Sequence, residues 1–231
     1  MATALLNLPL IAEGQAQTHI THNEALDLID GAFPRVVASA TTAAAPASPA
    51  DGEAYIVPAG ASGFGNIAEG RIAIRRGGLW HAIQPSPGAR WHVLDEGGAR
   101  IWTGTAWTQG DVIGASGAAL GLRVAEVVLS GVTGASVTAA GLIPARAIVL
   151  GVTSWTVADV TGAGSYRVGD AGSDSRYGGS LGIAAGSSNI GVVGPFATYS
   201  PTDVIVTAEG GAFTGGSIGL AACVILPGVP Q

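Results

Sequence analysis

Glycine occurs so often in this chain, at 37 of 231 residues, that long regular helices are disfavoured over most of its length. A glycine in a helix interior costs about 1 kcal/mol relative to alanine. In a tight turn, by contrast, glycine reaches backbone conformations that other residues avoid. We therefore expect a mainly β protein of short strands and tight turns, long enough for one large or two small domains.

The convincing helix signal lies near the N-terminus. Thr21-His22-Asn23-Glu24 fits a capping box, in which the threonine caps the first turn and the glutamate reaches back to it. Ala25 to Ile29 follow at near-helical spacing, and Gly31 can end the helix. A helix of about 9 residues depends on packing against another surface. We therefore interpret residues 1–37 as an attachment segment with a short helix.

Residues 38–109 predict a connector followed by a small β module. Residues 38–52 are poor in large apolar side chains and indicate an extended connector. Residues 53–109 hold short β-branched or aromatic runs, with turns expected at Gly77-Gly78 and Gly97-Gly98, which is typical of antiparallel hairpins. Residues 110–121 are rich in glycine, and we place a linker between two domains there.

Residues 122–231 predict a second β domain, a β-sandwich or jelly roll. The expected strands cover residues 123–130, 135–139, 145–158, 164–169, 179–185, 190–198, 203–209 and 216–226. The last of them is apolar on both faces, and such a strand is covered on both faces. We therefore expect a homo-oligomer, by preference a trimer, that associates through this domain.

Charge argues against several classes of protein. Charged residues make up only 11%, the net charge is −6, and all ten basic residues are arginine without a basic run. Nucleic acid and anionic membrane surfaces are therefore disfavoured as partners. No stretch of 18 apolar residues appears, so we expect no membrane insertion. Residues 4–11 are apolar but lack a basic flank, so we expect no signal peptide and synthesis in the bacterial cytoplasm.

Metal and thiol chemistry find little support in the sequence. The single cysteine, Cys223, excludes a disulfide framework, and we interpret it as a small buried apolar residue. His19 and His22 have a ligand-like spacing, but zinc needs three or four ligands and no third is near. We expect no metal and no cofactor.

The aromatic residues of the small module leave two interpretations open. Trp80, Trp91, Trp102 and Trp107 fall within 53–109, and so small a module needs large aromatics for its core. Alternatively, one or two of Trp80, Trp102 and Trp107 are exposed and stack on the apolar face of a sugar, with Arg90 nearby to bind hydroxyl groups.

The polar segment 170–177 is a candidate receptor contact at one end of the second domain. Its candidate side chains are Asp170, Asp174, Arg176 and Tyr177. Two carboxylates and loop carbonyls also suit Ca²⁺, although Asp174 and Arg176 would equally form a turn salt bridge.

Catalysis is not indicated by any motif. Cleavage of a polysaccharide needs two opposed carboxylates, one of them with a pKa raised by burial. Glu69, Asp95, Glu96 and Glu209 are available, but no motif ties two of them together. We expect no enzyme, and a polysaccharide depolymerase is the weaker alternative.

The N-terminal half resembles a domain family of unknown function found in fibre and spike proteins of alphaproteobacterial phages, prophages and gene transfer agents. The resemblance rests on LPLIAEGQAQ at 8–17, THNEAL at 21–26 and PASPADGEAYIV at 46–57, and continues at 78–80 and 104–107. The C-terminal half is similar to domains at the ends of such proteins, through residues 142–145, 174–178, 191–196 and 215–216.

The resemblance implies a virion surface protein, on a tail fibre or a head spike, that adheres to host polysaccharide. It also implies that the N-terminus contacts other virion structural proteins, and it supplies no catalytic residues. A structural adaptor that anchors another fibre is the alternative function.

Overall fold

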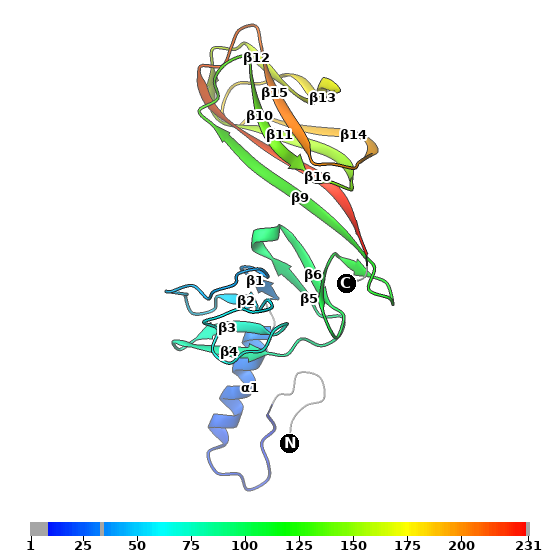
Figure 1. Cartoon of the computed structure of the whole chain (residues 1–231). Coiled ribbons are helices and arrows are strands. Elements are labelled where there is room, and N and C mark those ends of the chain that lie inside the picture. Colours follow the sequence, from blue (N-terminus) through cyan, green and yellow to red (C-terminus); the bar gives the residue numbers. More distant parts are fainter. Residues whose placement is uncertain (1–8, 33–34, 230–231) are drawn as a thin grey trace. The chain divides into compact units, whose positions relative to one another are not determined.

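The computed structural model describes residues 9–32 and 35–229, and the main-chain architecture is mainly β with a helix near the N-terminus, as the sequence predicted (Figure 1). The chain divides into two compact units. Unit 1 comprises residues 1–119 and 229–231, and unit 2 comprises residues 120–228. The division falls inside the glycine-rich segment 110–121. Residues 1–8 and 33–34 of the proposed attachment segment lie outside the described residues.

Helix α1 (Thr18–Ala32) is longer than the sequence predicted and begins upstream of the capping box. The chain reverses at Gln17, whose φ is 56°, and the Ile20 N–H already bonds to the Gln17 carbonyl. Thr21 therefore lies inside the helix, buried, where its hydroxyl accepts a hydrogen bond from Gln15 Nε2. The prediction that Thr21 caps the helix is wrong for this reason. Arg76 tethers the helix to the module through the Asp27 carboxylate at 3.2 Å.

The first sheet of unit 1 has the order β2-β3-β4, with strands β2 (Ala54–Ile56), β3 (Ile72–Arg76) and β4 (Leu79–Ile83). Gly77 and Gly78 join β3 to β4 with φ angles of 54° and 77°. A two-residue hairpin turn with positive φ at both positions favours two glycines. The hairpin predicted at this pair is confirmed.

The second sheet of unit 1 has the order β1-β5-β6-β7, and β1 runs parallel to β5. Its strands are β1 (Val36–Val37), β5 (Arg90–Val93), β6 (Gly98–Trp102) and β7 (Trp107–Gln109). The 3-10 turn η1 (Leu94–Glu96) and Gly97 at φ 59° connect β5 to β6. Strand β8 (Val112–Ile113) follows β7 in the chain.

The two sheets of unit 1 share one hydrophobic core. Ile56 and Ile72 from the first sheet pack with Trp91, Trp102 and Trp107 from the second. The segment 38–52, which the sequence predicted to be an extended connector, takes part in this packing: Ala40 is buried in the core together with Val37, which precedes the segment. Its backbone also bonds to the module, from the Ala38 N–H to the Ala54 carbonyl at 2.7 Å and from the Ala45 N–H to the Ser62 carbonyl at 2.9 Å. Small side chains permit this close approach of two backbones.

Unit 2 is a sandwich of two sheets. One is five-stranded with the order β14-β11-β16-β9-β8, of which the first four strands form unit 2, and the other is four-stranded with the order β10-β15-β12-β13 (Figure 1). The strands are β9 (Ala119–Ser130), β10 (Ser136–Ile143), β11 (Ala147–Thr161), β12 (Ser165–Asp170), β13 (Ser173–Leu181), β14 (Ser188–Thr198), β15 (Thr202–Glu209) and β16 (Gly215–Gly228). The first strand neighbours the last, the second the seventh, the third the sixth and the fourth the fifth. This nested pairing is the jelly-roll arrangement.

The core of unit 2 follows the alternation predicted for the last strand. Ile218, Leu220 and Val224 of β16 point inward and pack with Tyr166 and Val206. One expected strand is displaced: residues 173–181 pair with β12, whereas the sequence predicted a strand at 179–185. No helix in the described part of the chain is long and apolar enough to cross a membrane.

Candidate carbohydrate-binding groove

A groove of about 470 Å³ lies between the two sheets of unit 1. One wall comes from β2 and the residues after it, including Ile56, and the other from Arg100, Trp102 and Trp107 on β6 and β7. Glu69 also lines it. Pockets for small organic ligands have volumes of about 300–1,000 Å³ and combine an apolar lining with a few polar groups. The groove has a volume in this range, and its accessible lining is more polar than apolar.

Trp102 and Trp107 are cross-strand partners on one side of the groove. Their ring centroids lie 5.4 Å apart with the planes inclined by 53°. Trp107 Nε1 donates a hydrogen bond to the Gly70 carbonyl at 2.7 Å. Gly70 has a φ of 77°, and a Cβ there would fall 2.9 Å from the Trp102 ring. Glycine at position 70 therefore allows the chain to cross directly over the tryptophan pair.

Both tryptophans are only 7% exposed, and Trp91 is 3% exposed. Of the two interpretations left open by the sequence, the core role therefore holds for Trp102 and Trp107, because the sheets close over these rings. What remains at the groove is the small accessible part of each ring, next to Arg100.

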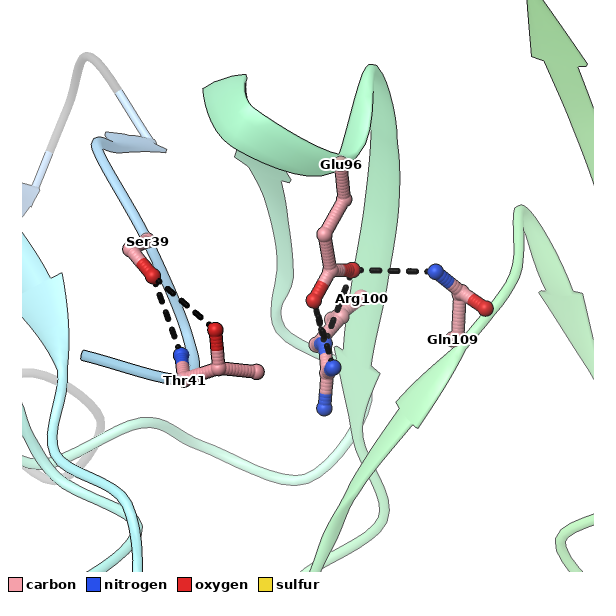
Figure 2. Close-up of polar contacts among 5 residues, drawn as sticks. All are labelled: Ser39, Thr41, Glu96, Arg100 and Gln109. Carbon is pink, nitrogen blue, oxygen red and sulfur yellow. Dashed lines mark hydrogen bonds and ion pairs between the residues drawn. The ribbon is translucent and has the colours of Figure 1, made fainter. Parts of the chain in front are cut away.

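Arg100 is held in a fixed orientation by Glu96 (Figure 2). Its Nε donates to both Glu96 oxygens at 3.1 Å, and its Nη2 donates to Oε1 at 2.5 Å. Gln109 Nε2 donates to Glu96 Oε2 at 3.0 Å. Both side chains of the pair are mostly buried, which restricts the conformations that they can adopt. The terminal nitrogen of Arg100 that does not bond to Glu96 points away from it (Figure 2). A planar donor fixed in this way suits a ligand oxygen.

The chain segment opposite Arg100 is fixed by its own side chains. Ser39 Oγ accepts a hydrogen bond from the Thr41 N–H at 3.0 Å and lies 3.4 Å from Thr41 Oγ1 (Figure 2). This local turn carries Ala40 into the groove wall. The wall is therefore preorganised, which lowers the entropic cost of binding.

The other two candidates from unit 1 lie away from the groove. Trp80 is half-buried between Tyr55 and Phe64, with ring centroids at 5.9 and 5.2 Å, and the Arg75 guanidinium covers its ring at 5.5 Å. Arg90 forms an ion pair with Asp111. The structure thus brings Trp102 and Trp107 together with Arg100, which sequence reasoning missed, and not with Trp80 or Arg90.

The candidate contact at 170–177 in unit 2 comprises the end of β12, a tight turn at residues 171–172 and the first residues of β13. Asp170 Oδ1 accepts hydrogen bonds from the Gly172 and Ser173 N–H groups at 2.9 and 3.0 Å. Its Oδ2 accepts from Arg176 Nε at 2.6 Å and from the Tyr177 hydroxyl at 3.3 Å. Asp170 therefore organises the turn between β12 and β13.

Burial changes the interpretation of this turn. Tyr177 is 1% exposed and Asp170 is 9% exposed, so neither contacts a receptor. Burial, followed by the negative charge of Asp170, raises the pKa of Tyr177 above its ordinary value. Because an arginine occupies Asp170 Oδ2, the carboxylate does not suit Ca²⁺, and no cluster of metal-ligating side chains occurs in the described residues. Asp174 and Arg176 remain exposed, and Asp174 pairs with Arg167 at 3.2 Å.

Comparison with known proteins identifies a domain in the N-terminal half. Residues 22–108 match the family model described as protein of unknown function (DUF2793). The search of curated proteins gave no match. Among solved structures, a chain of the cyanophage Pam1 capsid asymmetric unit is similar, with 26% identity and a TM-score of 0.36; the match covers 54% of this chain and 96% of that one. The prediction of a domain of unknown function is thus confirmed: residues 22–108 form a DUF2793 domain.

Proposed function

We propose that this chain is a surface protein of a phage or gene-transfer-agent particle, a tail fibre or head spike subunit, that binds host polysaccharide in the groove of unit 1. The particle origin is supported by the resemblance of residues 8–17, 21–26 and 46–57 to fibre and spike proteins. The binding function is supported by one observation: the Trp102–Trp107 pair and the fixed Arg100 guanidinium line the same groove.

The chemistry of the groove favours a neutral saccharide. A sugar ring has apolar C–H groups that can contact the small accessible part of each indole, and hydroxyl groups that accept from a guanidinium or donate to a carboxylate. Arg100 is already neutralised by Glu96, and Glu69 adds a negative charge to the lining. The negative charge of Glu69, which no free positive charge of Arg100 offsets, would repel an acidic polysaccharide but not a neutral one.

Groove-filling variants test the proposal. Thr105 is exposed at the groove, so Thr105→Trp obstructs it without removing a core contact. The matched control, Asn66→Trp, adds the same side chain at an exposed position of unit 1 that does not line the groove. We expect Thr105→Trp to weaken adsorption to purified host polysaccharide about tenfold or more. Asn66→Trp should adsorb normally, and both variants should melt like the parent protein. Equal adsorption by all three proteins would contradict the groove as the binding site.

We also propose that the chain binds without cleaving. Cleavage needs two opposed carboxylates. Glu69 lines the groove, but Glu96, next to Arg100, is occupied by Arg100 and Gln109 and is poorly placed to transfer a proton. Incubation with host capsule should release no new reducing ends, and release of them would favour a depolymerase.

A structural adaptor is the second candidate, favoured by the apolar side chains that α1 leaves exposed. Ile20 is 45% exposed and Leu26 is 50% exposed. These residues suit a contact with another virion protein through the N-terminus. Labelling the protein in intact particles separates the candidates: an adaptor lies at the base of another fibre, and an adhesin lies at the outer surface.

A further inference from the structure

The two outer faces of the jelly roll in unit 2 differ sharply in charge. The sheet β10-β15-β12-β13 carries a network in which Arg167 pairs with Asp174 at 3.2 Å and with Glu209 at 3.7 Å. On the outer face of the sheet β14-β11-β16-β9, the charged side chains are Glu126 on β9 and Asp159 near the end of β11, among the described residues. We call this second surface the apolar face.

The apolar face spans the whole width of its sheet. On β9, Ala125, Val127 and Leu129 pack inward, so the alternate residues point outward. On β14, Val193 and Phe196 pack inward, and Ile190 and Val192 point outward. The exposed aliphatic residues of the face are Leu120 (48%), Leu122 (63%), Val124 (45%), Val128 (50%), Val157 (46%), Ile190 (77%) and Val192 (76%).

The centre of the face is smooth. Trp155 on β11 is the register partner of Gly219 on β16, and a Cβ on Gly219 would fall 2.1 Å from the indole. The indole therefore lies flat on the glycine. The next outward residues of β16 are Ala221 and Cys223, which are small. The surface between the aliphatic residues of β9 and those of β14 is therefore apolar and carries only small side chains at these positions of β16.

The extent of the apolar face matches an interface between proteins. At about 100 Å² for a fully exposed aliphatic side chain, the face presents on the order of 500 Å² of apolar surface, with Trp155 and Ile225 included. A standard interface buries about 800 Å² on each partner, and about 65% of it is apolar between identical subunits, or roughly 520 Å². A patch of this size is as large as the largest apolar patch on most monomeric proteins, and such patches are often functional.

We propose that the apolar face is covered by the same face of another copy of this chain. A distinct partner would be selected by complementary charges, and this face offers almost none. The face carries two charged side chains, Glu126 and Asp159, so most of it can meet the same surface of a second copy without burying an unpaired charge. The proposal is independent of the sugar groove, because it concerns unit 2 alone.

Charge-insertion variants of the full chain test the proposal. Leu122→Glu and Val192→Glu change residues that are exposed in the single chain, so we expect each variant to keep the fold of the parent. The matched control, Thr138→Glu, adds the same charge at an exposed position of the other sheet. Sedimentation velocity should show the parent and Thr138→Glu as oligomers at micromolar concentration. Each face variant should associate about 100-fold more weakly, because a buried unpaired carboxylate opposes contact.

Two results would overturn the proposal: a monomeric parent, or an oligomer that both face variants retain. If the monomeric parent also sediments with neutral phosphatidylcholine vesicles and Val192→Glu does not, the face is assigned to lipid. Circular dichroism of each variant confirms that the fold is kept, so that a loss of association reports on the face itself.

Discussion

The indole of Trp155 rests on the backbone of Gly219, its cross-strand partner, with no room for a Cβ between them. We expect Gly219→Ala to lower the free energy of unfolding by about 1–3 kcal/mol, because the ring must leave its position. Gly194→Ala is the matched control, since a Cβ on Gly194 of β14 meets nothing within 4 Å. Urea titration of both variants measures the difference, and equal stability would show that Trp155 moves without cost.

Asp170 is expected to be the most sensitive acidic residue of unit 2. Its carboxylate accepts from two backbone N–H groups, from Arg176 and from Tyr177. Asp170→Ala leaves these donors without their acceptor and should cost about 3 kcal/mol. Asp203→Ala is a suitable comparison, because Asp203 is exposed and accepts from the Gly141 N–H at 2.7 Å. A thermal melt in which Asp170→Ala is no less stable than Asp203→Ala would contradict the role assigned to the β12–β13 turn.

Substitution by alanine should lower the free energy of unfolding more for the buried tryptophans of unit 1 than for the half-buried Trp80. Trp102→Ala and Trp107→Ala remove buried rings and should each cost about 3–5 kcal/mol. Trp80→Ala should cost about 2 kcal/mol, since part of that ring is accessible to solvent. Denaturation monitored by circular dichroism gives the order. If Trp102→Ala unfolded no more readily than Trp80→Ala, the closed packing of the two sheets would be incorrect.

Stability should fall at alkaline pH because of two tyrosines. Burial, and then the hydrogen bond that Tyr55 donates to Glu53, raise the pKa of Tyr55 to about 12. The pKa of Tyr177 is also raised, and an unfolded tyrosine ionises near pH 10. The neutral forms therefore stabilise the fold fully below about pH 10, and this contribution is lost as the pH rises toward the folded pKa values. Melting temperatures from pH 8 to 12 should fall less steeply for Tyr55→Phe; an unchanged slope would exclude Tyr55 as a cause.

Removal of residues 4–33 should abolish attachment of the protein to the particle while leaving the rest of the chain folded. Helix α1 contacts the module through Arg76, which bonds to the Asp27 carboxylate and carbonyl, while the two sheets have their own core. We expect the shortened protein to fold but to be absent from purified particles. Normal incorporation, measured by immunoblotting of particles, would contradict an attachment role.

Local signals predicted the parts of the fold that depend on neighbours in the chain. Gly77-Gly78 predicted the β3–β4 hairpin because both turn positions need positive φ, and the alternation of Ile218, Leu220 and Val224 predicted an inward face of β16. Strand β13 was misplaced because its residues are polar and rich in glycine. Its extended form depends on pairing with β12 and on the turn made by Asp170, which are contacts that composition does not reveal.

The candidate site was found only in part for a similar reason. The number of tryptophans drew attention to the correct module, but whether Trp102 is core or surface depends on how two sheets close. Arg100 lies four residues after Glu96 across the 3-10 turn and Gly97, and only that geometry turns an ordinary strand arginine into a fixed donor.

The nested pairing of unit 2 has a kinetic consequence. Strands β12 and β13 are joined by a short turn and can associate first, whereas β9 and β16 are separated by nearly the whole unit. Each outer pair closes a longer loop than the pair inside it, and the entropic cost of closure rises with loop length. We therefore expect the sheet that contains β9 and β16 to be completed last and slowly. Until then the residues of the apolar face are attached to an unfinished sheet, so a newly made chain is most prone to aggregate at this stage.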